Sequence, residues 1–478
     1  MKADLIHSIC CIGAGYVGGP TMAVIADRCP EINITVVDSN EDRINAWNNP
    51  DLRYLPVYEA GLDRVVERTR GRNLHFSTAV EDAIAVADMI FISVNTPTKS
   101  RGLGAGQASD LRWVEACARQ VAKYANGHTI VVEKSTLPVR TAATIKAILD
   151  ASSRDDLSGK LLPTFSVLSN PEFLAEGTAI KDLESPDRVL IGGEDNEVVD
   201  TLASIYAHWV PVDRILRTNL WSSELSKLIA NAFLAQRISS INSVSALCEV
   251  TGADVKEVAL AIGTDSRIGS KFLNAGPGFG GSCFKKDILN LVYLCGHFGL
   301  KEVASYWEQI VFINTWQQER ITNIVIQKLF GTVTAKKIAI LGFAFKSNTN
   351  DTRETPSKLI AQKLLEEGAY LSIHDPKVNP EQISIDLNKV PSPKQTESFK
   401  EGNWEIAVTI DDAIRGCDAV IILTEWDEYS HLDWHMLAKQ MRAPAWVFDT
   451  RSVVEKKSVI SSGLNLWRLG EGDNHSRK

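Results

Sequence analysis

The sequence has few cysteines for its length, eight in 478 residues, and no two of them form a CxxC pair. Their spacing is also unlike that of a small secreted scaffold held together by disulfides. These patterns exclude a zinc ribbon and a redox CxxC centre, and we expect a protein of a reducing compartment. His431 and His435 stand four residues apart, but the segment HLDWH lacks the glutamate of a zinc-binding HExxH motif. We interpret Asp433 as the cap of a surface helix and expect no metal.

Long hydrophobic runs are also missing, and acidic residues outnumber basic ones. No stretch approaches the roughly 20 apolar residues that a membrane-spanning helix needs. The N-terminal segment lacks the features of a signal peptide, which predicts a cytoplasmic protein without a membrane partner. Against 51 lysines and arginines there are 59 aspartates and glutamates, a net charge of −8. That balance argues against a nucleic-acid partner, and an anionic ligand would need a local basic pocket.

The sequence does have the composition of a folded protein of two or three domains. Hydrophobic residues make up 44% of the chain and charged residues 23%, close to the average of globular proteins. In the first part, helical patterns separate predicted strands over Ile6–Ile12, Ile34–Val37, Met89–Val94 and Thr129–Glu133. This alternation predicts an α/β fold with a parallel, doubly wound sheet.

A glycine-rich turn follows the first predicted strand. Gly13, Gly15 and Gly18 form a GxGxxG pattern that opens a helix, and Asp38 ends the second strand. In a dinucleotide-binding fold such glycines allow a tight turn and the approach of a pyrophosphate, while the acid binds the ribose hydroxyls and repels a 2′-phosphate. We therefore predict NAD rather than NADP, with Arg43 either near the adenine or an exposed helix charge. The residues assigned to the cofactor here are Gly13, Ala14, Gly15, Tyr16, Val17, Gly18, Asp38 and Arg43.

The middle and last parts of the chain differ from each other. A long helix is predicted over residues 219–250, where small residues interleave with apolar ones. This suits close packing against another helix, of the same chain or of a second subunit. From about Lys336 the order strand, turn, helix, strand, acid repeats, which predicts a second Rossmann-like half. We expect an NAD-binding domain at 1–218, a helical domain at 219–330 and a second Rossmann-like domain at 331–478.

The segment GFGGSCFKKD places Cys283 between a glycine-rich turn and a helical run. A thiol at a helix N-terminus is favoured as a thiolate nucleophile, and Gly280 and Gly281 beside it leave room for a flat ring or a sugar. Asp287 would share a helix face with Cys283. Lys227 and Asn231 have the same spacing on an otherwise apolar helix face. The alternative for Cys283 is an inert core thiol. The alternative for Lys227 is a lysine whose ammonium reaches solvent.

Several long motifs make the sequence similar to a known family. They are GAGYVGGP, FISVNTPT, EKSTLPVR, SNPEFLAEGTAI, ELSKLIANAFLAQRISSIN, GFGGSCFKKD, GFAFKSNTNDTRE and VFDTR, and together they reach from about residue 9 to about residue 470. On these motifs the chain resembles the UDP-glucose 6-dehydrogenase family, within the nucleotide-sugar dehydrogenases. The resemblance implies two Rossmann-like domains joined by a long central helix, with the UDP-sugar bound by the domain at 331–478.

The resemblance also implies a reaction, the oxidation of UDP-glucose at C6 to UDP-glucuronate with two NAD. Cys283 matches the nucleophile that holds the aldehyde as a thiohemiacetal and then as a thioester. Lys227 and Asn231 match the pair that stabilises the C6 alkoxide, and Glu172 matches the acid/base of thioester hydrolysis. The implied catalytic residues are Cys283, Lys227, Asp287, Glu172, Asn231 and Thr136, the last holding the catalytic water with Asp287.

Two sets of binding residues are implied as well. Besides the glycine motif, the cofactor would contact Val94, Asn95, Thr96, Pro97, Thr98, Ser135, Thr136, Glu176, Cys283 and Arg353. The nucleotide sugar would contact Glu172, Phe173, Leu174, Ala175, Glu176, Lys227, Asn231, Arg267, Phe272, Leu273, Asn274, Phe279, Gly280, Phe345, Lys346 and Arg451. Lys346 and Arg451 would supply positive charge for the diphosphate, and Arg267 would reach the sugar of a neighbouring subunit.

Other functions remain open on the sequence. A dehydrogenase of UDP-N-acetyl-mannosamine or GDP-mannose would use the same cysteine and lysine. A single-step dehydrogenase of the 3-hydroxyacid or 6-phosphogluconate type would share the fold but needs no nucleophilic cysteine. A catalytically silent NAD-binding scaffold is disfavoured by the intact Cys283, Lys227 and Asp287. Because family members form dimers and hexamers, we expect a homo-oligomer built on the long helix, of either order.

Overall fold

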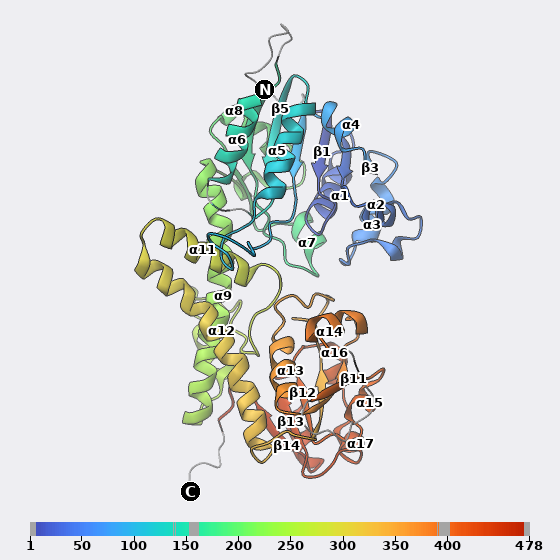
Figure 1. Ribbon diagram of the computed structural model, residues 1–478, viewed down its shortest axis with the longest axis vertical. Helices are drawn as coiled ribbons and strands as arrows, with labels where there is room; N and C mark the ends of the chain where they lie inside the picture. The colour runs from blue at the N-terminus through green and yellow to red at the C-terminus, as the bar shows by residue number, and fades with distance from the viewer. Residues whose placement is uncertain are drawn as a thin grey trace. The chain divides into compact units, whose positions relative to one another are not determined.

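The computed structural model describes residues 6–136, 138, 140–152, 162–389, 391 and 402–472. The chain forms two compact units, which Figure 1 draws as ribbons. The first consists of Met1–Ala230 with Leu289–Phe298, and the second of Asn231–Ile288 with Gly299–Lys478. The division into three domains at 218 and 330 stays a prediction.

The first unit is built on a β-sheet of eight strands. The strands are β1 (Ser8–Ile12), β2 (Asn33–Val37), β3 (Leu74–Ser77), β4 (Met89–Ile92), β5 (His128–Glu133), β6 (Thr164–Ser169), β7 (Val189–Gly192) and β8 (Ile215–Thr218). They lie in the order β3-β2-β1-β4-β5-β6-β7-β8, and all neighbours are parallel except β6 and β7. The strand order reverses between β1 and β4, the place where an open α/β sheet binds its ligand.

Helices cover both faces of this sheet. They are α1 (Gly18–Arg28), α2 (Glu41–Asn48), α3 (Leu62–Thr69), α4 (Val80–Ala85), α5 (Arg112–Tyr124), α6 (Thr141–Ser152), α7 (Ala179–Glu184) and α8 (Asn196–Tyr206), with short 3-10 helices at Leu52–Tyr54 and Val212–Arg214. Alternate residues of a strand point to opposite faces. In β1, Ile9 and Cys11 join a buried cluster with α1, α3, α7 and α8, whereas Cys10 and Ile12 join a second cluster with α4, α5 and α6. The doubly wound sheet predicted for this region is thereby confirmed.

Four consecutive helices follow β8 along the chain. They are α9 (Leu220–Thr251), α10 (Val255–Gly263), α11 (Phe284–His297) and α12 (Lys301–Lys328). The 32-residue α9 coincides with the long helix predicted over 219–250. The 28-residue α12 was not predicted, because buried polar residues such as Asn314 and Gln317 interrupt its apolar periodicity.

The second unit contains a parallel sheet of six strands. The strands are β9 (Lys337–Leu341), β10 (Tyr370–His374), β11 (Asn403–Ile406), β12 (Ala419–Ile422), β13 (Trp446–Asp449) and β14 (Asn465–Arg468), in the order β11-β10-β9-β12-β13-β14. The helices are α13 (Pro356–Glu366), α14 (Pro380–Leu387), α15 (Ile410–Ile414), α16 (Asp427–Ser430), α17 (Trp434–Ala438) and α18 (Lys456–Ser461). The strand order reverses between β9 and β12, so the predicted repeat of the Rossmann plan is confirmed.

Two smaller features of the fold concern one helix cap and the length and composition of the helices. Asp433 accepts hydrogen bonds from the backbone N–H groups of His435 and Met436, so it caps α17 as predicted. Among the described residues, no helix combines the length and the apolar composition that crossing a membrane would require.

Candidate active site

The glycine-rich turn lies between β1 and α1, at the carboxyl edge of the first sheet. Gly13 has a φ of 112°, and a Cβ there would lie 2.2 Å from the Ser93 carbonyl oxygen, so the position requires glycine. A Cβ at Gly18 would lie 2.0 Å from the Gly13 carbonyl oxygen. At Gly15, by contrast, nothing lies within 4 Å of a Cβ position. That open space at the N-terminus of α1 fits the pyrophosphate of NAD.

Asp38, the residue after β2, stabilises this turn. Its carboxylate accepts hydrogen bonds from the backbone N–H groups of Ala14 and Asn40, each at 3.0 Å, and pairs with the Arg43 guanidinium at 2.9 Å. Burial acts to raise the pKa of Asp38, but these donors outweigh burial and hold the pKa below its ordinary value. The side chain is therefore a charged acceptor, suited to ribose hydroxyls, and Arg43 is bound to the acid.

Trp47 of α2 supports the same turn and was missed in the sequence. Its indole N–H donates to the Ala14 carbonyl oxygen at 2.9 Å, and the side chain is fully buried. A Cβ at Gly19 would lie 2.2 Å from the indole ring. The available signal was a tryptophan in the otherwise polar helix EDRINAWN.

Two further loops meet at this edge of the sheet. Ser135, which follows β5, donates its hydroxyl to the Val94 carbonyl oxygen at 2.7 Å, and Thr96 donates to the Thr136 carbonyl oxygen at 3.0 Å. Because β1, β4 and β5 are neighbours, these loops lie at the edge that carries the glycine turn. The structure thus brings together the predicted cofactor residues of the turn, the loop 94–98 and the pair Ser135 and Thr136.

The loop from Glu172 to Glu176, which follows β6, begins with a buried ion pair. Glu172 Oε2 lies 3.1 Å from Lys134 Nζ, and the two side chains are 12% and 4% exposed. Glu172 Oε1 accepts hydrogen bonds from the backbone N–H groups of Phe173 and Leu174. Lys134 lies inside the motif EKSTLPVR but is not one of the site residues predicted from the sequence.

Phe173 of this loop contacts two cations. The Arg188 Cζ lies 3.8 Å from the ring centroid, and the Lys227 Nζ lies 5.3 Å from it. Such contacts stabilise a positive charge over an aromatic face. Lys227 projects from α9 and is 7% exposed. The structure therefore places the predicted Lys227 beside the predicted loop 172–176.

Cys283 is the residue before α11, and it is exposed, whereas the other cysteines are buried. Its carbonyl oxygen accepts the Asp287 N–H in the first helical turn. The buried Asp287 carboxylate accepts a hydrogen bond from Asn231 Nδ2 at 2.6 Å, and Lys286 Nζ lies 3.9 Å from its other oxygen. Lys227 precedes Asn231 by one turn on the same face of α9. The structure thus joins Asn231 to Asp287, one helical turn beyond Cys283.

The glycines before Cys283 serve the fold. A Cβ at Gly280 would lie 2.7 Å from both the Phe345 Cβ and the Glu354 carbonyl oxygen. The Gly281 N–H donates to the Arg353 carbonyl oxygen at 2.8 Å, which holds the turn against this segment. A Cβ at Gly281 would lie 3.1 Å from the Phe345 ring. The room expected beside Gly280 and Gly281 for a ring or a sugar is therefore filled by the chain itself on the side of the missing Cβ atoms.

Two buried amides of α12 hold the loop that precedes Cys283. Neither was predicted from the sequence as a residue of the site. Asn314 accepts a hydrogen bond from the Phe279 N–H at 2.8 Å and donates to the Phe279 carbonyl oxygen at 3.1 Å. Gln317 donates to the Gly276 carbonyl oxygen at 3.0 Å. Both side chains are buried, so the loop is anchored to α12 by satisfied polar groups.

Arg451 and Phe345 lie together at the carboxyl edge of the second sheet. Arg451 donates to the carbonyl oxygens of Phe345 at 3.0 Å and Leu423 at 2.8 Å, and it pairs with Glu425 at 3.1 Å. Lys346 Nζ lies 5.4 Å from the Phe345 ring centroid. The structure thus gathers three of the predicted nucleotide-binding residues at one place.

The remaining predicted residues are held within their own loops. Arg353 pairs with Asp351 at 2.7 Å, and the exposed Arg267 pairs with Asp265 at 2.6 Å. Phe272 and Asn274 are exposed, while Leu273 is buried in a small apolar cluster. These two ion pairs do not connect Arg353 or Arg267 to the group formed by Phe345 and Arg451.

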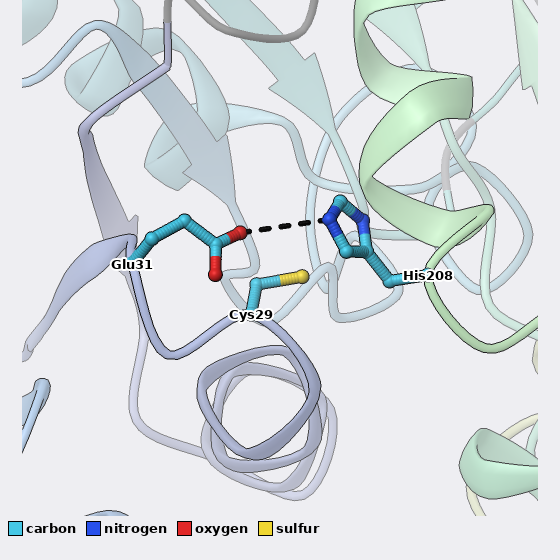
Figure 2. A group of neighbouring side chains, drawn as sticks. All are labelled: Cys29, Glu31 and His208. Atoms are coloured by element: carbon cyan, nitrogen blue, oxygen red, sulfur yellow. Dashed lines mark ion pairs between the residues drawn. The ribbon is translucent and has the colours of Figure 1, made fainter.

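One further group of chemically active side chains lies at the end of α1 opposite the glycine turn. Glu31 Oε1 lies 3.6 Å from His208 Nε2, with the Cys29 thiol nearby (Figure 2). The buried Cys29 sulfur donates to the Ile205 carbonyl oxygen at 3.8 Å, and burial, with the Glu31 charge, raises the pKa of Cys29 to about 12. A protonated, hydrogen-bonded thiol is a poor metal ligand. The group is a contact between Glu31 and His208 beside a core thiol.

Two Rossmann folds, with a glycine turn and an acid suited to NAD, define the class of NAD-dependent oxidoreductases. Three models of the UDP-glucose/GDP-mannose dehydrogenase family match successive parts of the chain: the NAD binding domain over residues 7–210, the central domain over 221–316 and the UDP binding domain over 339–456. The chain belongs to the UDP-glucose/GDP-mannose dehydrogenase family, which confirms the predicted resemblance.

Individual relatives are similar over nearly the whole chain. The UDP-glucose 6-dehydrogenase of Bos taurus is 57% identical over 476 residues, covering 98% of this chain and 93% of the relative. That of Gallus gallus is 58% identical over 456 residues, covering 94% and 90%. Among solved structures, a UDP-glucose dehydrogenase from the hyperthermophilic archaeon Pyrobaculum islandicum is 29% identical, covers 98% of both chains and has a TM-score of 0.81.

Proposed function

We propose that this chain oxidises UDP-glucose at C6 to UDP-glucuronate, through a thiohemiacetal and a thioester on Cys283. The observation that carries the proposal is the identity of 57% and 58% to proteins named UDP-glucose 6-dehydrogenase. The exposed Cys283, the buried Lys227 and the buried Asn231–Asp287 pair support it, because they are the groups that such a reaction needs.

NAD, when bound, accepts a hydride from the C6 carbon in each of the two oxidations. The residues proposed to hold it are the turn 13–18, Asp38, the loop 94–98 and Ser135. Gly15 leaves the backbone open to a pyrophosphate, and the charged Asp38 accepts hydrogen bonds from ribose hydroxyls.

In the first oxidation the C6 hydroxyl loses its proton while the carbon loses a hydride, which leaves an aldehyde. Lys227 is the proposed stabiliser of the developing alkoxide, since an ammonium in a water-poor site acts more strongly than one in bulk water. The contact with Phe173 supports this role by restricting the ammonium. Asn231, one turn along α9, can offer its second amide proton to the same oxygen while it stays bonded to Asp287.

In the second oxidation the Cys283 thiolate adds to the aldehyde carbon, and the aldehyde oxygen takes up a proton. The resulting thiohemiacetal still carries one hydrogen on C6. Loss of this hydrogen as a hydride, with loss of the hydroxyl proton, gives a thioester. The place of Cys283 before α11 supports its role, because a helix N-terminus favours an anion.

Hydrolysis completes the proposed reaction. Water attacks the thioester carbonyl carbon and gives up a proton, the C–S bond breaks, and the carboxylate leaves while the Cys283 thiolate is restored. Glu172 is the proposed base, and Thr136 and Asp287 are proposed to hold the water. Glu172 Oε2 is buried beside Lys134 and accepts no further hydrogen bond from the described residues, which leaves a lone pair free to take up a proton.

The amount of NADH formed per UDP-glucose consumed tests the proposal on the purified protein. We expect two NADH and one uronate per sugar. One NADH would instead indicate a single-step dehydrogenase, and none would indicate an NAD-binding scaffold. UDP-N-acetyl-mannosamine and GDP-mannose, assayed in parallel, should give lower kcat/KM values than UDP-glucose. A higher value for either would assign the chain to that substrate.

Replacing the nucleophile isolates the covalent step. Cys283→Ala is expected to form no appreciable uronate from UDP-glucose while still binding NAD and the sugar, because the second hydride transfer needs the thiohemiacetal. Cys295→Ala, at a buried cysteine of α11, the helix that follows Cys283, is the control and should keep two NADH per sugar. A Cys283→Ala enzyme that forms two NADH at a near-native rate would refute the covalent route, since the aldehyde would then react as its hydrate.

We also propose that the enzyme is a cytoplasmic homo-oligomer built on α9, with a nucleotide sugar as its partner and no nucleic acid. The helix carries the exposed apolar side chains Trp221, Leu225 and Phe233, which a second subunit would cover. The eight cysteines are free thiols, which supports a reducing compartment. A molar mass from light scattering gives the order of the oligomer.

A further inference from the structure

Lys134 is a buried lysine to which the reaction above gives no role. It follows β5 directly, and its side chain is 4% exposed. Its ammonium lies 3.1 Å from Glu172 Oε2, 3.1 Å from Asn170 Oδ1 and 3.4 Å from the Tyr206 hydroxyl. Burying an ammonium is unfavourable unless it is paired and hydrogen-bonded, so these partners account for its presence.

The partners of Lys134 are held in place by one another. The Tyr206 hydroxyl donates to Asn170 Oδ1 at 2.7 Å, and Asn170 Nδ2 donates to the Leu190 carbonyl oxygen at 2.8 Å. These contacts tie the end of α8 and the loop after β6 to the backbone of β7. The ammonium therefore sits in a rigid polar network rather than on a flexible loop.

The charges around Lys134 favour its ammonium form. Burial lowers the pKa of Lys134, but the Glu172 carboxylate and the Tyr206 hydroxyl outweigh burial, and the net pKa lies above its ordinary value. Cys11 of β1 also faces it, and burial raises the pKa of that thiol far above its ordinary value, so the thiol is neutral. Glu172 thus supplies the negative charge for Lys134.

Glu172 is held at both of its carboxylate oxygens. Lys134 contacts Oε2, and the backbone N–H groups of Phe173 and Leu174 bond Oε1. These donors fix the plane of the carboxylate. The loop that carries Glu172 also carries Phe173, which contacts the Lys227 ammonium.

We propose that Lys134 is a positioning residue whose ammonium orients the Glu172 carboxylate as the base of thioester hydrolysis. The inference rests on the proposed function, which gives Glu172 that role. In this step a water proton passes to Glu172 while the water oxygen bonds to the thioester carbon. The C–S bond breaks, the Cys283 sulfur leaves as a thiolate, and the new acid ionises. Lys134 keeps its proton and forms no bond to the substrate.

A double-mutant cycle on the full-length protein tests the inference, using the wild type, Lys134→Met, Glu172→Gln and the double variant. Lys134→Met is expected to lower kcat by roughly 10²- to 10⁴-fold, the range of a lost general base. The KM values for UDP-glucose and NAD should change little. The acid limb of the pH–kcat profile should move to higher pH, because a buried carboxylate without its cation takes up a proton more readily. Adding Lys134→Met to Glu172→Gln should change kcat little, since the positioned group is already gone.

Two further readouts separate positioning from a merely structural role. Rapid quenching followed by mass spectrometry of the intact protein should show the sugar bound to Cys283 in Lys134→Met and in Glu172→Gln, because hydrolysis has become slow. Lys134→Arg keeps the charge and should return the acid limb toward that of the wild type. Lys146→Met is the matched control, because it removes the exposed lysine of an ion pair with Glu194 in the same unit, and it should leave kcat unchanged.

Additive losses in kcat with an unmoved acid limb would overturn the inference and leave Lys134 a structural residue. Thermal melting shows whether each variant folds. If Lys134→Met alone does not fold, Lys134→Arg and the double variant, which has no unpaired buried charge, still decide between the outcomes. A wild type that forms one NADH per sugar would contradict the proposed function instead, because that readout does not involve Lys134.

Discussion

Among single residues, we propose that Asp38 and its partner Arg43 decide the choice between NAD and NADP. Asp38→Asn is expected to weaken NAD binding by about 1.5–3 kcal/mol, roughly 10- to 150-fold, because a charged acceptor for the ribose hydroxyls is lost. NADP should bind more tightly at the same time, since the substitution frees the Arg43 guanidinium from its 2.9 Å ion pair and removes the charge that repels a 2′-phosphate.

Isothermal titration with each dinucleotide measures both changes. Asp42→Asn is the control, because Asp42 lies in the exposed first turn of α2, the helix that carries Arg43, and has no expected contact with the ribose. If Asp38→Asn bound NAD as the wild type does, Asp38 would not be at the ribose.

At the scale of one element, the turn between β1 and α1 contains two glycines with different roles. Gly13→Ala places a methyl group 2.2 Å from the Ser93 carbonyl oxygen at a φ of 112°, so it should lower the stability of the first unit by about 1–3 kcal/mol or more. Gly15→Ala meets no atom within 4 Å, so the fold should keep its melting temperature. The same substitution should weaken NAD binding, because the methyl group occupies the space for the pyrophosphate.

Thermal melting and NAD titration of this pair of variants separate folding from binding. Each variant serves as the control of the other, since both add one methyl group to the same turn. Equal melting temperatures for the two variants, or unchanged NAD binding by Gly15→Ala, would contradict this division of roles.

The pH dependence of unfolding belongs to the scale of the whole molecule, and Glu133 of β5 contributes a distinct part of it. Burial raises the pKa of Glu133 well above its ordinary value of 4.5, and the neighbouring Glu224 adds to the rise. Glu224 itself accepts hydrogen bonds from the backbone N–H groups of Arg140 at 2.7 Å and Ala142 at 2.8 Å. Glu133 therefore keeps its proton in the folded chain but loses it in the unfolded chain. Between the two pKa values the free energy of unfolding falls by up to about 1.4 kcal/mol per pH unit.

Glu133→Gln is expected to remove this slope and to stabilise the protein near neutral pH, because a neutral amide can donate to Glu224 as the protonated acid does. Urea unfolding at several values between about pH 5 and pH 8 measures the slope. Glu194→Gln, at an exposed glutamate, is the control and should keep the slope of the wild type. A Glu133→Gln variant with that same slope would show that Glu133 is ionised in the folded chain.

Features that depend on neighbours along the chain could be predicted from the amino-acid sequence. GAGYVGGP between two predicted strands, followed by Asp38, was enough for the NAD turn, because that turn needs glycines at fixed local positions. The alternation of strand and helix predicted both Rossmann sheets, and the periodicity of 219–250 predicted α9. Asp433 was recognised as a helix cap for the same reason, since a cap acts on the next few residues.

The partners of the buried polar groups could not be predicted, because they depend on how distant segments pack together. Lys134 and Glu172 form an ion pair between segments that follow different strands, and Asn314 of α12 bonds a loop that precedes it in the chain. A single lysine or amide has no periodicity, so nothing local distinguishes such a residue from a surface one. Gly280 shows the same limit, because its missing side chain makes space for Phe345, a residue of a distant segment, and not for a ligand. Contacts of this kind exist only once the chain is packed.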